Sequence, residues 1–150
     1  MAARIALLRE ELRRDWQQVE LHCAKAVDTD PSAGEAQCAL VALSLDHAYQ
    51  AFETMLLRVE GSLGLPERQG SAWHAALLDA ARLPLAELRP PLLPEAAYPD
   101  WEALRRFRHF LRHAYAVPLD PEALQRNVRR LTRAVEATSP LVLALIEALG

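Results

Sequence analysis

The sequence is poor in cysteine and contains no long apolar run. Two cysteines, Cys23 and Cys38, stand among 150 residues. Two are too few for a disulfide framework or a thiolate zinc site, so we interpret them as small buried thiols. No stretch approaches the roughly 20 apolar residues that a membrane-spanning helix needs, and we expect no membrane partner.

A recognisable signal peptide is also missing. Arg4, Arg9, Glu10 and Glu11 interrupt the apolar residues near the start of the chain. We therefore expect a cytoplasmic protein. The length fits one domain over residues 1–150, which is enough to bury a core without cross-links.

Lysine is nearly absent, and arginine supplies the positive charge unevenly. Residues 1–100 hold nine basic and fifteen acidic side chains, whereas residues 101–133 hold eight arginines and three acids. The chain as a whole carries a net charge of -3. This distribution is unlike that of a protein that coats nucleic acid, but the local basic region can hold a few phosphates.

Strand-like alternation is absent, and apolar residues recur at helical spacings of three and four. The pattern predicts an all-α fold, an antiparallel bundle of four or five helices joined partly by short turns. The expected helices cover residues 3–28, 33–61, 72–83 and 100–115, with a last one from residue 121 onward.

Several residues indicate where these helices begin and break. Ser32 followed by Glu35 predicts a capping box for the second helix, and Ser71 predicts a cap for the third. Asp120 followed by Pro121 predicts the start of the last helix. Ser139-Pro140 predicts either a kink in that helix or a separate terminal one.

Five prolines between residues 84 and 99 prevent a long helix from forming there. We expect only a short helical turn over residues 85–89 in this segment.

The helix over residues 100–115 places an arginine where a leucine is expected. Trp101, Leu104, Leu111 and Tyr115 fall within about 60° of Arg108 on a helical wheel. A guanidinium in an apolar stripe needs a charged partner or a wet cleft, because an unpaired buried charge is costly. The alternative is an arginine that reaches solvent from the edge of the stripe.

His109 and His113 lie one turn apart on the polar face of this helix, beside Arg105 and Arg112. Two histidines at this spacing are compatible with metal binding, but the sequence offers no third ligand nearby. We therefore expect no metal and no cofactor. Solvated histidines on a basic face are the simplest alternative.

Four residues separate Arg108 from His113, and one residue separates His113 from Tyr115. This arrangement resembles the signature of HepT-type ribonuclease toxins of the HEPN superfamily. The polar His109 directly after the arginine also fits that pattern. The resemblance implies a metal-independent endoribonuclease with Arg108 and His113 as catalytic residues. His109, Arg105 and Arg112 would then support the binding of RNA.

Metal-independent RNA cleavage suits these side chains. Histidine moves protons near neutral pH, and arginine holds the phosphate with a fixed positive fork. On a straight helix, however, Arg108 and His113 lie about 140° apart. Either the last turn loosens, or two copies of the chain meet in a homodimer, as the resemblance implies. The stripe containing Trp101 and Leu104 fits such a seam, although core burial explains it equally well.

The resemblance also implies a partner, an MNT-type nucleotidyltransferase antitoxin that transfers AMP to Tyr115. Bulk and negative charge at this position would block the access of RNA and neutralise the basic cleft. Two alternatives from other functional classes remain. One is a non-catalytic helical adaptor that binds a nucleotide or a nucleotidyltransferase, and the combination of Arg108, His109 and His113 argues against it. The other is a purely structural four-helix bundle, which is all that composition alone supports.

Overall fold

The computed structural model describes residues 1–114 and 117–150, and over these residues its regular secondary structure is helical apart from one isolated bridge. This confirms the predicted all-α bundle. The elements in chain order are α1 (Ala2–Asp28), η1 (Pro31–Ala33), α2 (Glu35–Ser62), α3 (Trp73–Ala81), η2 (Glu95–Ala97), α4 (Tyr98–His113) and α5 (Pro121–Ala148). None of the described helices is both long and apolar enough to cross a bilayer.

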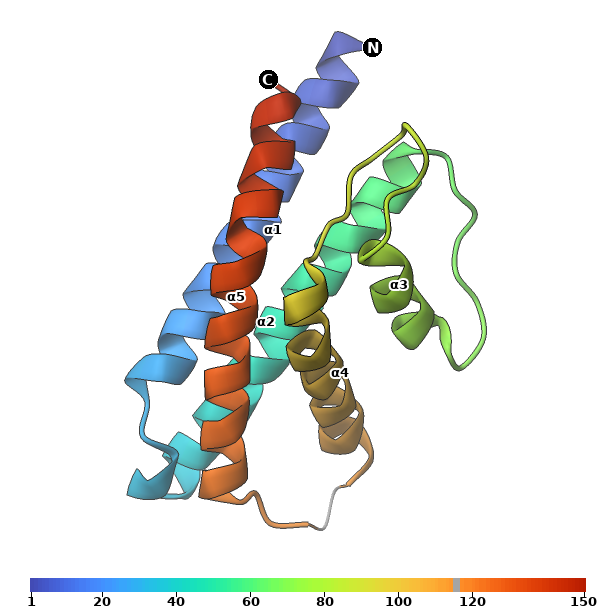
Figure 1. Cartoon of the computed structure of the whole chain (residues 1–150). Helices are drawn as coiled ribbons and strands as arrows, with labels where there is room; N and C mark the ends of the chain where they lie inside the picture. The colour runs from blue at the N-terminus through green and yellow to red at the C-terminus, as the bar shows by residue number, and fades with distance from the viewer. Residues whose placement is uncertain (115–116) are drawn as a thin grey trace.

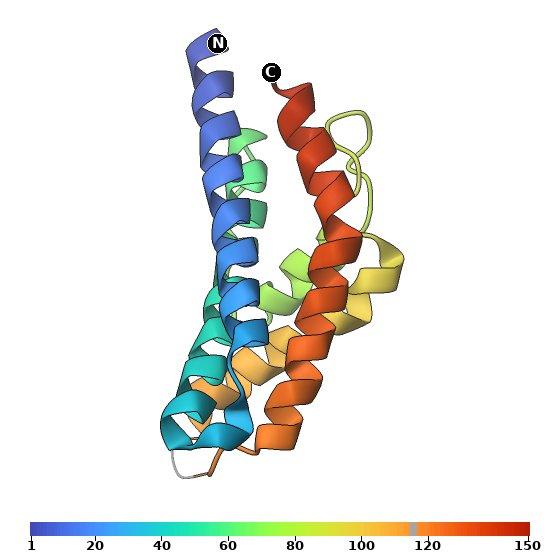
Figure 2. The ribbon, with the colours of Figure 1, turned by 90° about the vertical axis from the view of Figure 1, so that its left-hand side faces the viewer.

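Three long helices form the body of the molecule. Helix α1 runs antiparallel to both α2 and α5, and the two chain ends meet at the same end of the bundle (Figure 1). The view at 90° shows α1 and α5 side by side along their length (Figure 2). Helix α4 packs against α2, α3 and α5. The part of the basic segment that lies on α4 therefore contacts three other helices.

The turn between α1 and α2 differs from the predicted capping box. The carboxylate of Asp30 accepts hydrogen bonds from the backbone N–H of Ser32 at 2.9 Å and from its hydroxyl at 2.7 Å. This fixes the short η1 turn, and Gly34 rather than Ser32 stands at the N-cap of α2. The prediction was wrong because the Ser32 hydroxyl donates backward to Asp30 instead of capping the next helix.

The N-terminus of α3 also differs from its prediction. Residues 71–72 form a turn, so Ala72 takes the N-cap position that we assigned to Ser71. The helix then ends at Ala81, two residues before the predicted end.

The proline-rich segment that follows contains no helical turn at residues 85–89. Leu85 and Arg89 pair instead as an antiparallel bridge, in which the N–H of Leu85 donates to the carbonyl of Arg89 at 3.1 Å. The Arg89 guanidinium donates to the carbonyls of Ala80 and Leu83. These bonds tie the loop to the end of α3, which explains why a bridged turn replaces the expected helical one.

Helix α5 begins as predicted and continues through its internal proline. The Asp120 side chain accepts a hydrogen bond from the N–H of Glu122 at 3.2 Å, and Pro121 is the first helical residue. Pro140 lies inside a helix of 28 residues. The possibility of a separate terminal helix is therefore excluded.

The core is built around an aromatic stack that joins α2 to α4. The rings of Phe52 and Trp101 lie 3.9 Å apart between centroids at an interplanar angle of 14°, and Trp16 of α1 meets Phe52 edge-on. The indole N–H of Trp101 donates to the hydroxyl of Thr138 at 3.0 Å. Because Trp101 begins the stripe of α4, this contact sets which face of α4 is buried.

Candidate functional site

Helices α2, α3 and α4 enclose a cavity of about 320 Å³ on one side of the bundle. The described site residues predicted from the sequence all line it. The complete lining consists of Tyr49, Ser71, His74, Arg105, Arg108, His109, Arg112 and His113. Tyr115, the predicted modification site, lies outside the described residues. The cavity is strongly basic, because three arginines and three histidines line it.

Arg108 enters this cavity from the buried face of α4. The residue is only 9% exposed to solvent. Its Nε donates a hydrogen bond to Oδ1 of Asp46 at 2.9 Å. A second carboxylate, Glu53, lies 3.8 Å from its Nη1. The expected requirement for a partner or a wet cleft is thus met by both, since two carboxylates of α2 balance a guanidinium that also lines a cavity.

Glu53 connects three of the groups around the cavity. It is 5% exposed, and its Oε2 accepts a hydrogen bond from the Tyr49 hydroxyl at 3.0 Å. The Nδ1 of His74 lies 2.8 Å from the same oxygen. Burial raises the pKa of Tyr49 far above its usual value near 10, and the neighbouring Glu53 carboxylate raises it further. Glu53 therefore fixes the positions of a phenol, an imidazole and, more distantly, the Arg108 guanidinium.

The two α4 histidines lie at the outer edge of the cavity. Their ring centroids are 4.4 Å apart, and both side chains are exposed. His113 is the last residue of α4, and Ala114 leaves helical geometry at φ -110° and ψ 65°. The helix thus stays regular as far as His113, yet Arg108 and His113 line the same cavity within one chain.

The two supporting arginines differ in their surroundings. Arg105 is half-buried and ion-paired with Glu102, and this hydrogen bond raises the pKa of its guanidinium. Arg112 is exposed beside His113. Of the two, Arg112 is the more accessible to a phosphate from solvent.

The apolar stripe of α4 is part of the core of a single chain. Trp101 and Leu104 are 0% and 1% exposed, and Leu111 packs partly buried against the core. Core burial therefore accounts for this stripe. Trp101, Leu104 and Leu111 are used within one chain and do not form a dimer interface.

Sequence reasoning missed the carboxylates and His74. Asp46, Tyr49 and Glu53 follow one another at spacings of three and four on α2, which places three polar side chains on one helical face. This pattern was the available signal. His74 carries no comparable signal, because only the tertiary structure brings α3 against α2. Over residues 1–114 and 117–150, no three His, Cys, Asp or Glu side chains are grouped as metal ligands would be.

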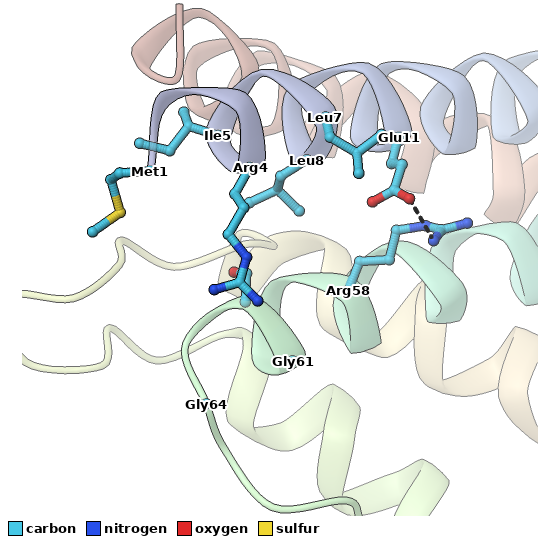
Figure 3. A pocket seen from close by; sticks show the side chains of 10 residues that line it. Met1, Arg4, Ile5, Leu7, Leu8, Glu11, Arg58, Gly61 and Gly64 are labelled. Carbon is cyan, nitrogen blue, oxygen red and sulfur yellow. Dashed lines mark ion pairs between the residues drawn. The ribbon is translucent and has the colours of Figure 1, made fainter.

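A larger cavity, of about 680 Å³, lies between the start of α1 and the end of α2 (Figure 3). Apolar side chains such as Ile5 and Leu8 line it, together with an ion pair of 3.6 Å between Arg58 and Glu11. Among residues 1–114 and 117–150, no histidine or cysteine lines this cavity. The smaller basic cavity is therefore the better candidate for proton-transfer chemistry.

Comparison with known proteins agrees with the helical architecture. A family model described as HepT-like protein matches residues 40–149, which include α3, α4, α5 and most of α2. No curated protein and no solved structure matches the chain significantly. All of the residues that line the basic cavity fall inside the matched range.

Proposed function

Because this chain belongs to the HepT-like family of the HEPN superfamily, we propose that it is a metal-independent endoribonuclease and the toxin of a HEPN–MNT toxin–antitoxin pair. The observation that carries the proposal is the shared cavity of Arg108 and His113. Arg105, Arg112 and His109 line the same cavity and would bind the flanking phosphates.

The chemistry follows from the two principal side chains. Arg108, held by Asp46 through Nε, keeps other N–H groups of its fork for a phosphate oxygen. As negative charge gathers on the phosphate in the transition state, this guanidinium stabilises it. The exposed His113 imidazole transfers a proton at the ribose or at the leaving oxygen. The products are a 2′,3′-cyclic phosphate and a 5′-hydroxyl.

Regulation by AMP is the second part of the proposal. Tyr115 follows the end of α4 by two residues, so it is close in sequence to His113. An AMP group on its hydroxyl, transferred by an MNT-type nucleotidyltransferase antitoxin, would bring bulk and a negative phosphate to the basic cavity. We therefore expect the AMP-modified protein to be inactive.

The third part is a homodimer in which the two basic cavities share one RNA-binding cleft. Since Arg108 and His113 line one cavity of a single chain, each subunit carries its own pair. Mixing an Arg108→Ala subunit with a His113→Ala subunit should then restore no activity. Recovery to about a quarter of the wild-type rate, the statistical value for one intact composite site per mixed dimer, would show that the pair is shared between subunits.

The decisive experiment uses purified full-length protein that mass spectrometry shows to be free of AMP. It should cleave cellular RNA and leave cyclic-phosphate ends, whereas His113→Ala should abolish cleavage and leave the circular dichroism spectrum unchanged. His22→Gln is the matched control, because His22 lies against His47 outside the basic cavity. If the unmodified protein leaves RNA intact and cells overproducing it grow normally, the adaptor alternative is favoured.

A further inference from the structure

His74 is a histidine of the basic cavity that the proposed function does not use. It stands in the first turn of α3, and its Nδ1 lies 2.8 Å from Oε2 of Glu53 on α2. Its side chain is 37% exposed, so the ring is accessible while one of its nitrogens is engaged. Its ring also stacks on Trp73, with centroids 3.6 Å apart.

The partner of His74 is a carboxylate with little freedom to move. Glu53 is buried, accepts a hydrogen bond from the Tyr49 hydroxyl and lies 3.8 Å from a nitrogen of Arg108. A carboxylate fixed in this way favours the ring tautomer that carries a proton on Nδ1. The lone pair of His74 is then on Nε2, which is the arrangement of a general base oriented by an acid.

The proposed reaction requires two proton transfers at opposite sides of one phosphorus atom. The ribose 2′-oxygen attacks in line with the departing 5′-oxygen, so the two proton positions are too far apart for one imidazole to serve both. A second acid–base group is needed. Tyr49 and Glu53 of α2, together with Arg105, Arg108, His109, Arg112 and His113 of α4, are the titratable and charged groups that line or contact the same cavity.

We infer that His74 is this second catalytic residue, acting as the general base opposite His113; the inference rests on the proposed ribonuclease function. Nε2 of His74 takes the proton of the 2′-hydroxyl as the bond from the 2′-oxygen to phosphorus forms. The bond from phosphorus to the 5′-oxygen breaks, and His113 gives its proton to that oxygen. No water is consumed, and the cyclic phosphate and 5′-hydroxyl account for every atom.

The position of each histidine supports this division of roles. His113 is the last residue of α4 and is exposed to solvent, which leaves its ring free to deliver a proton to the leaving oxygen. His74 has a carboxylate partner that supports its positive charge after it accepts a proton. His109 packs its ring against His113 and is therefore assigned to binding.

The test compares His74→Gln, His113→Gln and the control His22→Gln on one short RNA with a mapped cleavage site. Circular dichroism and thermal unfolding establish that each variant is folded. We expect His74→Gln to lower the cleavage rate about 10²–10⁴-fold and to remove the rise of the rate with pH on the acidic side of the profile. The control should keep the wild-type rate and profile.

A second substrate separates the two roles. The same RNA with sulfur in place of the 5′-bridging oxygen has a leaving group that needs no proton. It should restore cleavage by His113→Gln and leave the loss of rate in His74→Gln uncorrected.

The outcomes distinguish this inference from the function on which it rests. If the wild-type protein cleaves RNA and His113→Gln does not, but His74→Gln keeps the wild-type rate and pH profile, His74 only joins α3 to α2 and the inference is overturned. It is also overturned if the sulfur substrate rescues His74→Gln instead of His113→Gln. If the folded wild-type protein cleaves no RNA, the proposed function itself fails and takes the inference with it.

Discussion

Arg108 on α4 and Asp46 on α2 are joined by a hydrogen bond of 2.9 Å between Nε and Oδ1. This pair links α4 to α2 and orients the Arg108 guanidinium, which lines the basic cavity. Because Nε is used for the contact with Asp46, the terminal nitrogens carry the N–H groups that a phosphate can bind. The same contact therefore neutralises a buried charge and positions a reactive group.

Arg108→Lys tests whether the planar geometry of the Arg108 guanidinium matters beyond its positive charge. A lysine ammonium cannot hold Asp46 and a phosphate in the same fixed geometry. We expect RNA cleavage to fall about 10²–10³-fold, the usual effect of removing one preorganised donor to a transition state. Single-turnover kinetics measures the loss. Arg133→Lys is the control, since Arg133 is an exposed arginine of α5 that pairs with Asp100. An Arg108→Lys variant as active as this control would mean that charge alone suffices.

Thr138→Val should destabilise the protein by removing the acceptor of the Trp101 indole. Both residues are fully buried, so the N–H would be left without a partner at a cost of about 1–3 kcal/mol. Urea unfolding followed by tryptophan fluorescence measures the change. Thr138→Ser keeps the hydroxyl and loses one methyl group, and it should cost about 1 kcal/mol. Equal effects of the two substitutions would show that the hydrogen bond contributes little.

Tyr49 should make the fold sensitive to alkaline pH. In the unfolded chain Tyr49 has a pKa near 10. In the folded protein its pKa is higher, so the hydroxyl keeps its proton at pH values above 10. Above about pH 10 the unfolded state therefore binds fewer protons than the folded state. The free energy of unfolding then falls with rising pH, by about 1.4 kcal/mol per pH unit for this one group.

The matching variant is Tyr49→Phe, which removes the titrating group. Urea unfolding across this alkaline range should give a shallower fall of the unfolding free energy for the variant than for the wild type. Tyr98, whose pKa burial also raises, is present in both proteins and cancels in the comparison. Parallel curves for the two proteins would contradict the prediction.

Asp120→Ala should weaken the start of α5. The Asp120 carboxylate satisfies a backbone N–H of the first turn, and losing such a cap costs about 0.5–2 kcal/mol. Thermal unfolding should show a lower melting temperature for this variant, while Asp120→Asn, which keeps an acceptor oxygen, should stay close to the wild type. A melting temperature unchanged by Asp120→Ala would mean that water replaces the cap at no cost.

Most helices could be predicted because helix formation is largely a local property. The apolar spacing within α1 and α2 and the Asp120-Pro121 start of α5 specify their elements without reference to the rest of the chain. The errors fall where two local options compete. The Ser32 hydroxyl could either cap α2 or donate to Asp30. In the structure it donates to Asp30 within the η1 turn.

The candidate site divides in the same way. Arg108, His109 and His113 could be selected from the sequence, because an arginine in an apolar stripe and two histidines beside it are visible within one helix. The polar spacing of Asp46, Tyr49 and Glu53 is also visible within one helix, but the partners of these residues could not be selected from it, nor could His74. The contact between His74 and Glu53 joins residues 21 positions apart, and that between Arg108 and Asp46 joins residues 62 positions apart. A local pattern does not specify which distant residues meet.

The sequence by itself determined that this chain is a helical bundle with a basic segment that spans α4 and the first half of α5, since periodicity and charge are properties of consecutive residues. Only the tertiary structure decided which side chains surround that helix. Packing Trp101 against Phe52 fixes the rotation of α4 on α2, and this rotation turns Arg108 toward Asp46 and Glu53. The basic cavity lies where the buried face of α4, which carries Arg108 beside Trp101 and Leu104, meets residues of α2 and α3.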